Sequence, residues 1–331
     1  MGDTPRHWAG GPALVRVRGL AAHFAVRRAI IGMPTRFVHA VDDVSFEIRQ
    51  GETLGLVGES GCGKSTLGRT LLALRPPTAG EVEFDGKRIF DLGSAELKAL
   101  RRHMQLVFQD PFASLNPRLS VGKSVRAALD IHGIGKRAER DRMVEEIFLR
   151  VGLRRSHTTR FPHEFSGGQR QRVGIARALV LRPKFLVCDE PVSALDVSIQ
   201  AQILNLLKDL QAEFGLTYLF ISHNLAVVEH MADRVAVMYY GRIVEIADRS
   251  ELYANPRHPY THALFGAVPA PDPTVRSMRV EAQGDPPDPM SLPSGCRFRT
   301  RCPRAVERCA KEEPRLAPAG GSHQVACWLA Q

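Results

Sequence analysis

The length and composition of the chain favour a folded protein with one large domain or two smaller ones. The 331 residues are 44% hydrophobic and 24% charged, which supplies enough apolar material for a core and excludes wholesale disorder. No run of about 18 apolar residues occurs, so we expect no helix that spans a membrane. The first dozen residues lack the apolar core of a signal peptide, and we therefore expect the chain to stay in the cytosol.

The formal charge of +10 results from 45 Lys and Arg residues against 35 Asp and Glu residues. Such an excess is compatible with a nucleic-acid partner, with an anionic ligand or lipid surface, or with an ordinary solvated surface. The basic residues are scattered, without a dense basic tail or helix, and this distribution favours the solvated surface.

The N-terminal third of the chain predicts strands and one helix. Alternating apolar and polar residues are typical of half-buried strands, a continuous apolar run is typical of a buried strand, and an Asp-Gly pair predicts a hairpin turn. After a loose tail at 1–12, the predicted elements are strands at 13–18 and 37–48 with a loop insertion at 27–35 between them, a buried strand at 53–57, a helix from 58 to about 74, and a hairpin at 81–89.

The rest of the chain predicts strands that alternate with helices. Uninterrupted apolar strands in such an alternation predict a mostly parallel sheet covered on both faces. The predicted elements are a strand at 104–108, helices at 121–131, 138–151 and 167–181, a buried strand at 185–188, a helix at 199–214, a strand at 217–222, a helix at 225–231, and strands near 235–239 and 242–246. The interval of about 112–182 contains only predicted helices, so we expect an inserted helical lobe there.

The strongest motif directly follows the apolar strand at 53–57. It matches the phosphate-binding pattern G-x-x-x-x-G-K-[ST] and opens a predicted helix, a context that favours nucleotide binding over a purely structural glycine turn. The glycines let backbone N–H groups converge on phosphate oxygens, while Lys64 supplies charge for the outer phosphates and the Ser65 hydroxyl can bind Mg²⁺. The motif, called the P-loop below, consists of Gly58, Glu59, Ser60, Gly61, Cys62, Gly63, Lys64, Ser65 and Thr66.

Two adjacent carboxylates end the apolar strand at 185–188. Asp189 can hold Mg²⁺, directly or through water, and Glu190 can point the other way and activate a water molecule. Adjacent acids at a strand end are often merely solvated, but the P-loop upstream favours a catalytic role for this pair.

Four further motifs complete a resemblance to ABC-type ATPases. The segment after Phe165 resembles the signature loop of that family and precedes a predicted helix. Three other segments resemble, in order, the loop glutamine that senses Mg²⁺ and the attacking water, the D-loop, and the switch histidine. The residues that carry the resemblance are Ser166, Gly167, Gly168 and Gln169 of the signature loop, Gln109, the D-loop Ser193-Ala194-Leu195-Asp196, and His223.

The resemblance covers residues 13–255 and implies an α/β P-loop NTPase fold with a mostly parallel sheet, an antiparallel β subdomain and an inserted helical subdomain. In the family, the signature loop closes over ATP held by a partner subunit. Glu190 would then be the general base, Gln109 and His223 would orient the water and the γ-phosphate, and Ser65, Gln109 and Asp189 would manage Mg²⁺. We expect Phe24 to stack on the adenine, with Phe37 as second choice and core packing as the alternative for both rings.

The segment 255–261, Asn-Pro-Arg-His-Pro-Tyr-Thr, resembles the one that follows the ATPase core in ABC importers of dipeptides, oligopeptides and nickel. Proline becomes dense at 269–293 and predicts a linker-like crossing within a C-terminal extension at 256–331. The resemblance implies a peripheral subunit at the cytoplasmic face of the cell membrane. One partner would be a second ABC ATPase subunit, identical or related. Two transmembrane permease subunits would meet residues 111–117, and an extracytoplasmic substrate-binding protein would be an indirect partner. No nucleic-acid partner is expected.

Four of the six cysteines crowd the end of the chain. In a reducing compartment such a group suggests metal ligation before disulfides, and soft thiolates select Zn²⁺ or iron–sulfur clusters. The paired knuckles of structural zinc sites are absent. The importer resemblance implies a structural [4Fe-4S] cluster, with Zn²⁺ or unmetallated thiols as alternatives and His323 as a possible substitute ligand. The four residues are Cys296, Cys302, Cys309 and Cys327.

Other functions remain as alternatives to an ATPase that powers peptide import. A soluble ABC ATPase that acts on nucleic acid or the ribosome usually carries a coiled coil or two tandem ATPase units, and a P-loop kinase or GTPase lacks the signature loop. An exporter ATPase is normally fused to membrane helices. An importer of nickel or another small solute stays open, because the sequence of this subunit does not name the substrate.

Overall fold

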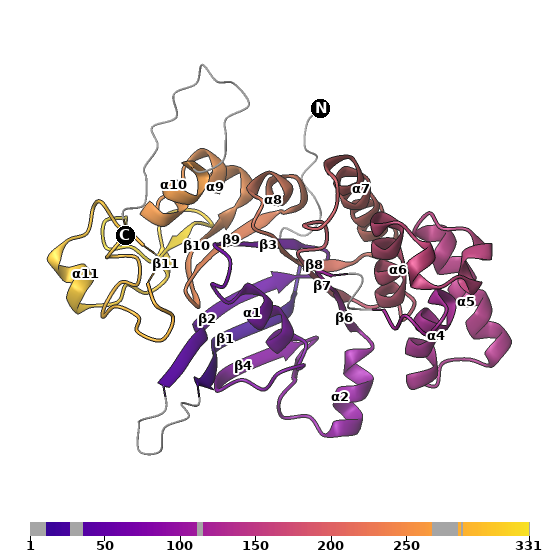
Figure 1. Cartoon of the computed structure of the whole chain (residues 1–331). Coiled ribbons are helices and arrows are strands. Elements are labelled where there is room, and N and C mark those ends of the chain that lie inside the picture. The colour runs from indigo at the N-terminus through magenta and orange to yellow at the C-terminus, as the bar shows by residue number, and fades with distance from the viewer. Residues whose placement is uncertain (1–10, 27–35, 111–114, 267–283, 286, 331) are drawn as a thin grey trace. The chain divides into compact units, whose positions relative to one another are not determined.

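The computed structural model describes residues 11–26, 36–110, 115–266, 284–285 and 287–330 (Figure 1). The chain forms two compact units, each assembled from separate stretches of sequence. Unit 1 comprises Met1–Leu14, Ile48–Thr53 and Asp91–Ile221, and unit 2 comprises Val15–Glu47, Leu54–Phe90 and Ser222–Gln331. The predicted loop insertion lies outside the described residues. The same holds for most of the predicted tail and for most of the proline-dense crossing. The predicted boundary between 255 and 256 stays a prediction.

Unit 1 contains three parallel strands whose residues are largely buried. The pairs β6–β7 and β7–β8 are parallel, and all five residues of β7 and of β8 are buried, as expected for strands covered on both faces. The buried hydroxyl of Tyr218 on β8 donates a hydrogen bond to the carbonyl of Leu207 on α7 at 2.8 Å and fastens this helix to the strands. These elements are β6 (Met104–Val107), β7 (Phe185–Asp189), β8 (Thr217–Ile221), α2 (Ser94–Arg101) and α7 (Val197–Phe214).

Between β6 and β7, the described residues of unit 1 form helices and their connections, as the sequence predicts for the helical lobe. Helix α4 contacts both α5 and α6. The Ser120 side chain caps α4 by accepting a hydrogen bond from the Lys123 N–H, and Gly122 lets the helix approach the Thr158 carbonyl so closely that a Cβ would lie 2.5 Å from the oxygen. The elements are α4 (Val121–Ile131), α5 (Arg137–Arg150), η1 (Arg155–Thr159), η2 (Pro162–Glu164) and α6 (Gly167–Leu179).

Unit 2 contains the antiparallel sheet predicted as a β subdomain. Its strand order is β2-β1-β4-β5, and the pairs β1–β4 and β4–β5 are antiparallel. Asp85 and Gly86 both have positive φ angles, of 51° and 77°, so the turn between β4 and β5 is the tight hairpin that the Asp-Gly pair predicts. The strands are β1 (Ala13–Val26), β2 (Arg36–Arg49), β4 (Ala79–Phe84) and β5 (Lys87–Arg88).

A second group of strands in unit 2 joins the P-loop strand to the C-terminal extension. Strand β3 is parallel to β9, β9 is antiparallel to β10, and two short strands of the Cys-rich extension continue antiparallel from β10. The sequence did not predict these two strands, β11 and β12. The elements are β3 (Thr53–Val57), β9 (Arg234–Tyr239), β10 (Arg242–Asp248), β11 (Ala317–Pro318), β12 (Gln324–Val325), α1 (Lys64–Leu71), α8 (Leu225–Met231), α9 (Arg249–Ala254), α10 (Pro259–Gly266) and α11 (Glu307–Lys311).

None of the helices in the described part of the chain is both long and apolar enough to cross a bilayer.

Candidate active site

The P-loop connects β3 to α1 in unit 2, and its glycines are required by geometry. Gly63 has a φ of +110°, a conformation that disfavours any side chain, and a Cβ there would lie 1.8 Å from the Ala40 carbonyl oxygen on β2. A Cβ on Gly58 would lie 2.2 Å from the Met238 carbonyl oxygen on β9. The loop therefore packs against both strands at a distance that only glycine permits.

Lys64 is the first residue of α1 and is 5% exposed. Its ammonium donates hydrogen bonds to the carbonyls of Gly58 at 2.7 Å and Glu59 at 2.9 Å, so the charge is held inside the curl of the loop. Burial raises the pKa of the Cys62 thiol, and the nearby Lys64 only partly opposes this shift. Cys62 therefore stays protonated at neutral pH and acts as a packing residue.

His223 lies in the bend that leads into α8, also in unit 2. The Asn224 side chain caps this helix by accepting hydrogen bonds from the N–H groups of Ala226 at 3.0 Å and Val227 at 3.4 Å. The His223 side chain itself is exposed. The cap fixes the backbone next to the histidine, and the imidazole is accessible.

In unit 1, the structure brings together Gln109 and Glu190. They follow the neighbouring parallel strands β6 and β7, and the Gln109 amide donates a hydrogen bond to Glu190 Oε2 at 2.9 Å. Glu190 has a φ of +48°, which is uncommon for a residue with a side chain, and its N–H donates to the Ile221 carbonyl at 3.0 Å. Asp189, the last residue of β7, is 3% exposed, whereas Glu190 is half-buried. The two carboxylates thus occupy different environments.

The signature loop begins α6 with a reciprocal cap. Ser166 accepts a hydrogen bond from the Gln169 N–H at 3.3 Å, and the Gln169 side chain accepts one from the Ser166 N–H at 3.1 Å. Gly168 packs against α7, because a Cβ there would lie 2.5 Å from the Ile199 side chain. Asp196 precedes α7 as its N-cap, so the signature loop and the D-loop contact the same helix start.

The two aromatic candidates for adenine binding are both accessible on strands of unit 2. The Phe24 ring on β1 is half-buried, with the Arg75 guanidinium 5.0 Å from its centroid. Phe37 on β2 is 48% exposed. The assignment of adenine stacking to Phe24 stays a prediction.

Comparisons with known proteins agree with these motifs. A family model described as "ABC transporter" matches residues 41–193. The oligopeptide transport ATP-binding protein AppF of Bacillus subtilis is 49% identical over 324 residues, which are 97% of this chain and 98% of AppF. The chain belongs to the ABC transporter family. It is therefore an ATPase of the ABC type.

Further relatives of this ABC ATPase extend the comparison. A Brucella ovis protein whose name contains "peptide import ATP-binding protein" is 54% identical over 314 residues, with 95% of this chain and 97% of the relative covered. A dimeric post-hydrolysis structure of the ATP-binding cassette MJ0796, bound to ADP and Pi, has a TM-score of 0.63 and 30% identity and covers 71% of this chain and 98% of that one. A second family model, "Oligopeptide/dipeptide transporter, C-terminal region", matches residues 244–309.

The four clustered cysteines of the ABC ATPase line one small cavity of about 20 Å³ in unit 2. All four carry free thiols, and burial raises the pKa of Cys296 to about 12 and also raises the pKa of Cys302 and Cys327. Among the described residues, no three of these sulfurs lie within 4.8 Å of one another. A tetrahedral zinc site with Zn–S bonds of about 2.3 Å needs sulfurs about 3.8 Å apart, so the spacing is wider than zinc requires.

The prediction that His323 serves as a substitute metal ligand is wrong. The imidazole is fully buried, with Nε2 2.6 Å from a Glu245 carboxylate oxygen and Nδ1 3.3 Å from one of Glu251. Both ring nitrogens already face carboxylates, so the ring binds β10 and α9 together and has no nitrogen left for a metal.

A different group in unit 2, His23, His39 and Asp42, has ligand atoms within 4.8 Å of one another. Burial, followed by the nearby His23, lowers the pKa of His39. However, the Asp42 carboxylate already binds the guanidinium groups of Arg242 and Arg297. Two adjacent cations oppose the binding of a third, and we assign no metal to this group.

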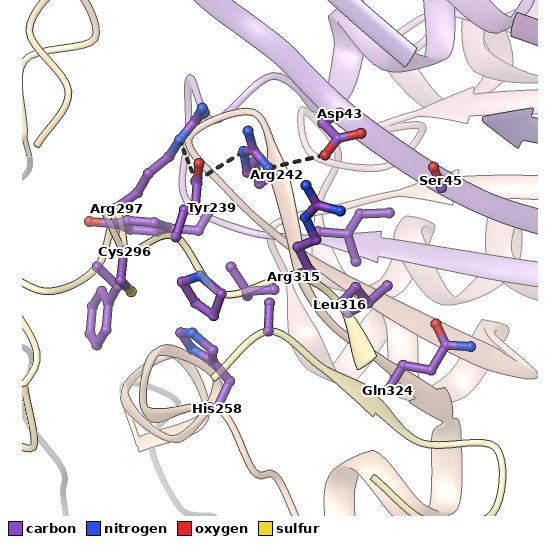
Figure 2. A pocket seen from close by; sticks show the side chains of 16 residues that line it. Asp43, Ser45, Tyr239, Arg242, His258, Cys296, Arg297, Arg315, Leu316 and Gln324 are labelled. Carbon is purple, nitrogen blue, oxygen red and sulfur yellow. Dashed lines mark hydrogen bonds and ion pairs between the residues drawn. The ribbon is translucent and has the colours of Figure 1, made fainter. Parts of the chain in front are cut away.

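A cavity of about 300 Å³ lies beside these arginines (Figure 2). Arg242 faces Asp43 at 3.4 Å and Glu313 at 3.0 Å, and Arg297 also contacts Glu313, at 3.2 Å. The charged groups are thus paired along the wall of the cavity. The lining contains none of the P-loop residues, so this cavity is separate from the phosphate-binding loop.

Proposed function

We propose that this ABC ATPase powers the import of dipeptides or oligopeptides across the cell membrane. The observation that carries the proposal is the presence, in one chain, of the ABC segment at 41–193 and the oligopeptide/dipeptide transporter C-terminal region at 244–309. The names of AppF and of the Brucella relative, which match along nearly their whole lengths, support the same substrate class.

In the proposed reaction, a water molecule attacks the γ-phosphate of ATP in line with the bond to the leaving ADP. The P-loop amides and Lys64 bind the phosphates, and His223 contacts the γ-phosphate. Glu190 removes a proton from the water, a role worth about 10²–10⁴ in rate, and the hydrogen bond from Gln109 orients its carboxylate. Ser65, Asp189 and Gln109 would hold Mg²⁺, which neutralises charge on the phosphates when it is bound.

The proposed assembly is a pair of ABC ATPase subunits attached to two transmembrane permease subunits. ATP on the P-loop of one subunit is covered by the signature loop of the other, where Ser166 is exposed at the start of α6. The dimeric MJ0796 cassette, bound to ADP and Pi, supports the pairing of two ATPase subunits. The chain would then lie on the cytoplasmic face of the membrane, and the predicted permease contact at 111–117 falls largely outside the described residues.

The four clustered cysteines would hold a structural [4Fe-4S] cluster. Two observations support this proposal: all four thiols line the same cavity, and no three of their sulfurs, all within the described region, are as close as a zinc ion would demand. Each of the four cysteine thiolates would bind a different iron of the cluster, so the ligands would lie farther apart than around one zinc ion.

The experiment for peptide import is ATP hydrolysis by the chain purified with its partners and reconstituted in vesicles. Peptide-loaded binding protein should raise the hydrolysis rate several-fold and drive labelled peptide into the vesicles, whereas nickel should do neither. Stimulation by nickel alone, or by nucleic acid or ribosomes without the permeases, would overturn the peptide assignment.

A further inference from the structure

The P-loop is held by two residues of the C-terminal extension. The Glu59 backbone N–H donates a hydrogen bond to the Tyr260 hydroxyl at 2.9 Å, and the Arg301 guanidinium lies 3.0 Å from both carboxylate oxygens of Glu59. All three residues belong to unit 2. The second residue of the P-loop is therefore fixed through both its main chain and its side chain.

The two residues that hold the P-loop are largely shielded from water. Tyr260 is 1% exposed and the Arg301 side chain 11% exposed, while the Glu59 side chain retains 32% exposure. Charge-assisted hydrogen bonds in such surroundings are stronger than neutral ones. Tyr260 in turn packs on two other rings, with centroid distances of 4.5 Å to Tyr239 and 5.5 Å to Phe298. The hydroxyl that meets the P-loop therefore projects from a rigid aromatic cluster.

Arg301 lies on a short segment whose two ends belong to the cysteine cavity. Cys296 and Cys302 both line that cavity, and the Cys296 N–H donates a hydrogen bond to the Cys309 carbonyl at 2.8 Å. Within the segment, Arg297 binds the Asp42 carboxylate and the Tyr240 carbonyl. The packing of Cys296 and Cys302 at the cavity, together with the hydrogen bond to Cys309, thus fixes the segment that carries Arg301.

The charge of Glu59 makes the Arg301 contact relevant to ATP binding. A carboxylate on a loop that binds phosphates repels them, and a paired guanidinium cancels most of that repulsion. The Glu59 carbonyl also accepts a hydrogen bond from Lys64 at 2.9 Å, so movement of Glu59 shifts the lysine as well. Both effects act on affinity for ATP rather than on the chemical step.

We propose that Arg301 and Tyr260 are positioning residues of the P-loop, through which the Cys-rich extension sets the affinity of the chain for ATP. The inference rests on the nucleotide-binding role proposed for the P-loop. Its test is the equilibrium binding of a fluorescent ATP analogue with Mg²⁺ to the full chain. Arg301→Gln should weaken binding about tenfold, as expected for loss of a charge-assisted hydrogen bond, and Tyr260→Phe roughly threefold. Arg299→Gln is the matched control, because Arg299 lies on the same segment but contacts Ser294, and it should bind within about twofold of wild type.

A rescue experiment distinguishes this role from a contribution to folding alone. Because Glu59→Gln removes the repelling charge, the double variant Glu59→Gln/Arg301→Gln should bind ATP within about threefold of wild type, well above Arg301→Gln. If Arg301→Gln fails to fold, the Tyr260→Phe result decides, since that change removes a single hydroxyl from an intact ring.

Lys64→Ala in the same assay separates failure of the inference from failure of the proposed function. Unchanged binding by Lys64→Ala would remove the nucleotide-binding role of the P-loop. Loss of binding by Lys64→Ala, together with unchanged binding by Arg301→Gln and Tyr260→Phe or no rescue by Glu59→Gln, would overturn only the role of the extension.

Discussion

At the scale of single residues, Glu190, the proposed general base, has an unusual backbone conformation. A φ of +48° is uncommon for glutamate, and it is maintained here by the backbone hydrogen bond to Ile221 and the side-chain hydrogen bond from Gln109. Strained backbone of this kind collects at functional sites, where the surrounding structure holds it in place. The motif predicted a role for this residue, but only the structure reveals its conformation and its contact with Gln109.

His258 carries a residue-scale prediction about pH. Its ring is 2% exposed and accepts a hydrogen bond from the Tyr260 N–H at 3.0 Å; burial, with a smaller effect from His262, lowers its pKa to about 3. In the unfolded chain its pKa returns to about 6.5, so between these values the unfolded state binds one more proton. The free energy of unfolding should therefore fall as pH decreases below about 6.5, by at most about 1.4 kcal/mol per pH unit from this group.

The measurement is urea unfolding of wild type and His258→Asn at pH 7 and pH 5. Asparagine retains an acceptor for the Tyr260 N–H but does not titrate. Wild type should lose about 1–2 kcal/mol more than the variant between the two pH values. Equal losses would show that His258 is not kept neutral by the fold.

At the scale of elements, apolar runs and long amphipathic segments were predicted well. Strand β3 and helices α4 and α8 have the predicted bounds, because a buried strand and a helix with one buried face leave a clear pattern. Helix α2 was missed because it is only eight residues long and has one buried residue, Leu100. The helix predicted from residue 58 begins at Lys64, because the preceding glycines form the P-loop.

Contacts between distant parts of the chain could not be read from the sequence. Tyr260 and Arg301 meet Glu59 across 201 and 242 residues, and no local pattern pairs them. Strands β11 and β12 have two residues each; β12 pairs with the edge of β10, and β11 pairs with β12. The P-loop was predictable because its motif consists of residues adjacent in sequence. The residues that hold it in place are distant in sequence and come near it only in the folded chain.

The Cys-rich extension has its own prediction. Protein purified without oxygen should be brown and contain about four iron atoms per chain, and Cys309→Ser should lose most of this iron. Cys188→Ala is the matched control, because Cys188 is equally a buried free thiol but lies on β7, and it should keep its iron. Colourless protein with one zinc per chain would contradict the cluster.

At the scale of the whole molecule, the residues proposed for phosphate binding and for water activation belong to different units. Lys64 and the rest of the P-loop are in unit 2, whereas Gln109 and Glu190 are in unit 1. Substitutions in the two units should therefore separate binding from hydrolysis.

The most direct test of the account measures ATP retention and phosphate release by the purified transporter complex with Mg²⁺. Lys64→Ala should retain little ATP, while Glu190→Gln should retain ATP as well as wild type does and release phosphate at least about 100-fold more slowly. Phosphate release at the wild-type rate by either variant would contradict the account.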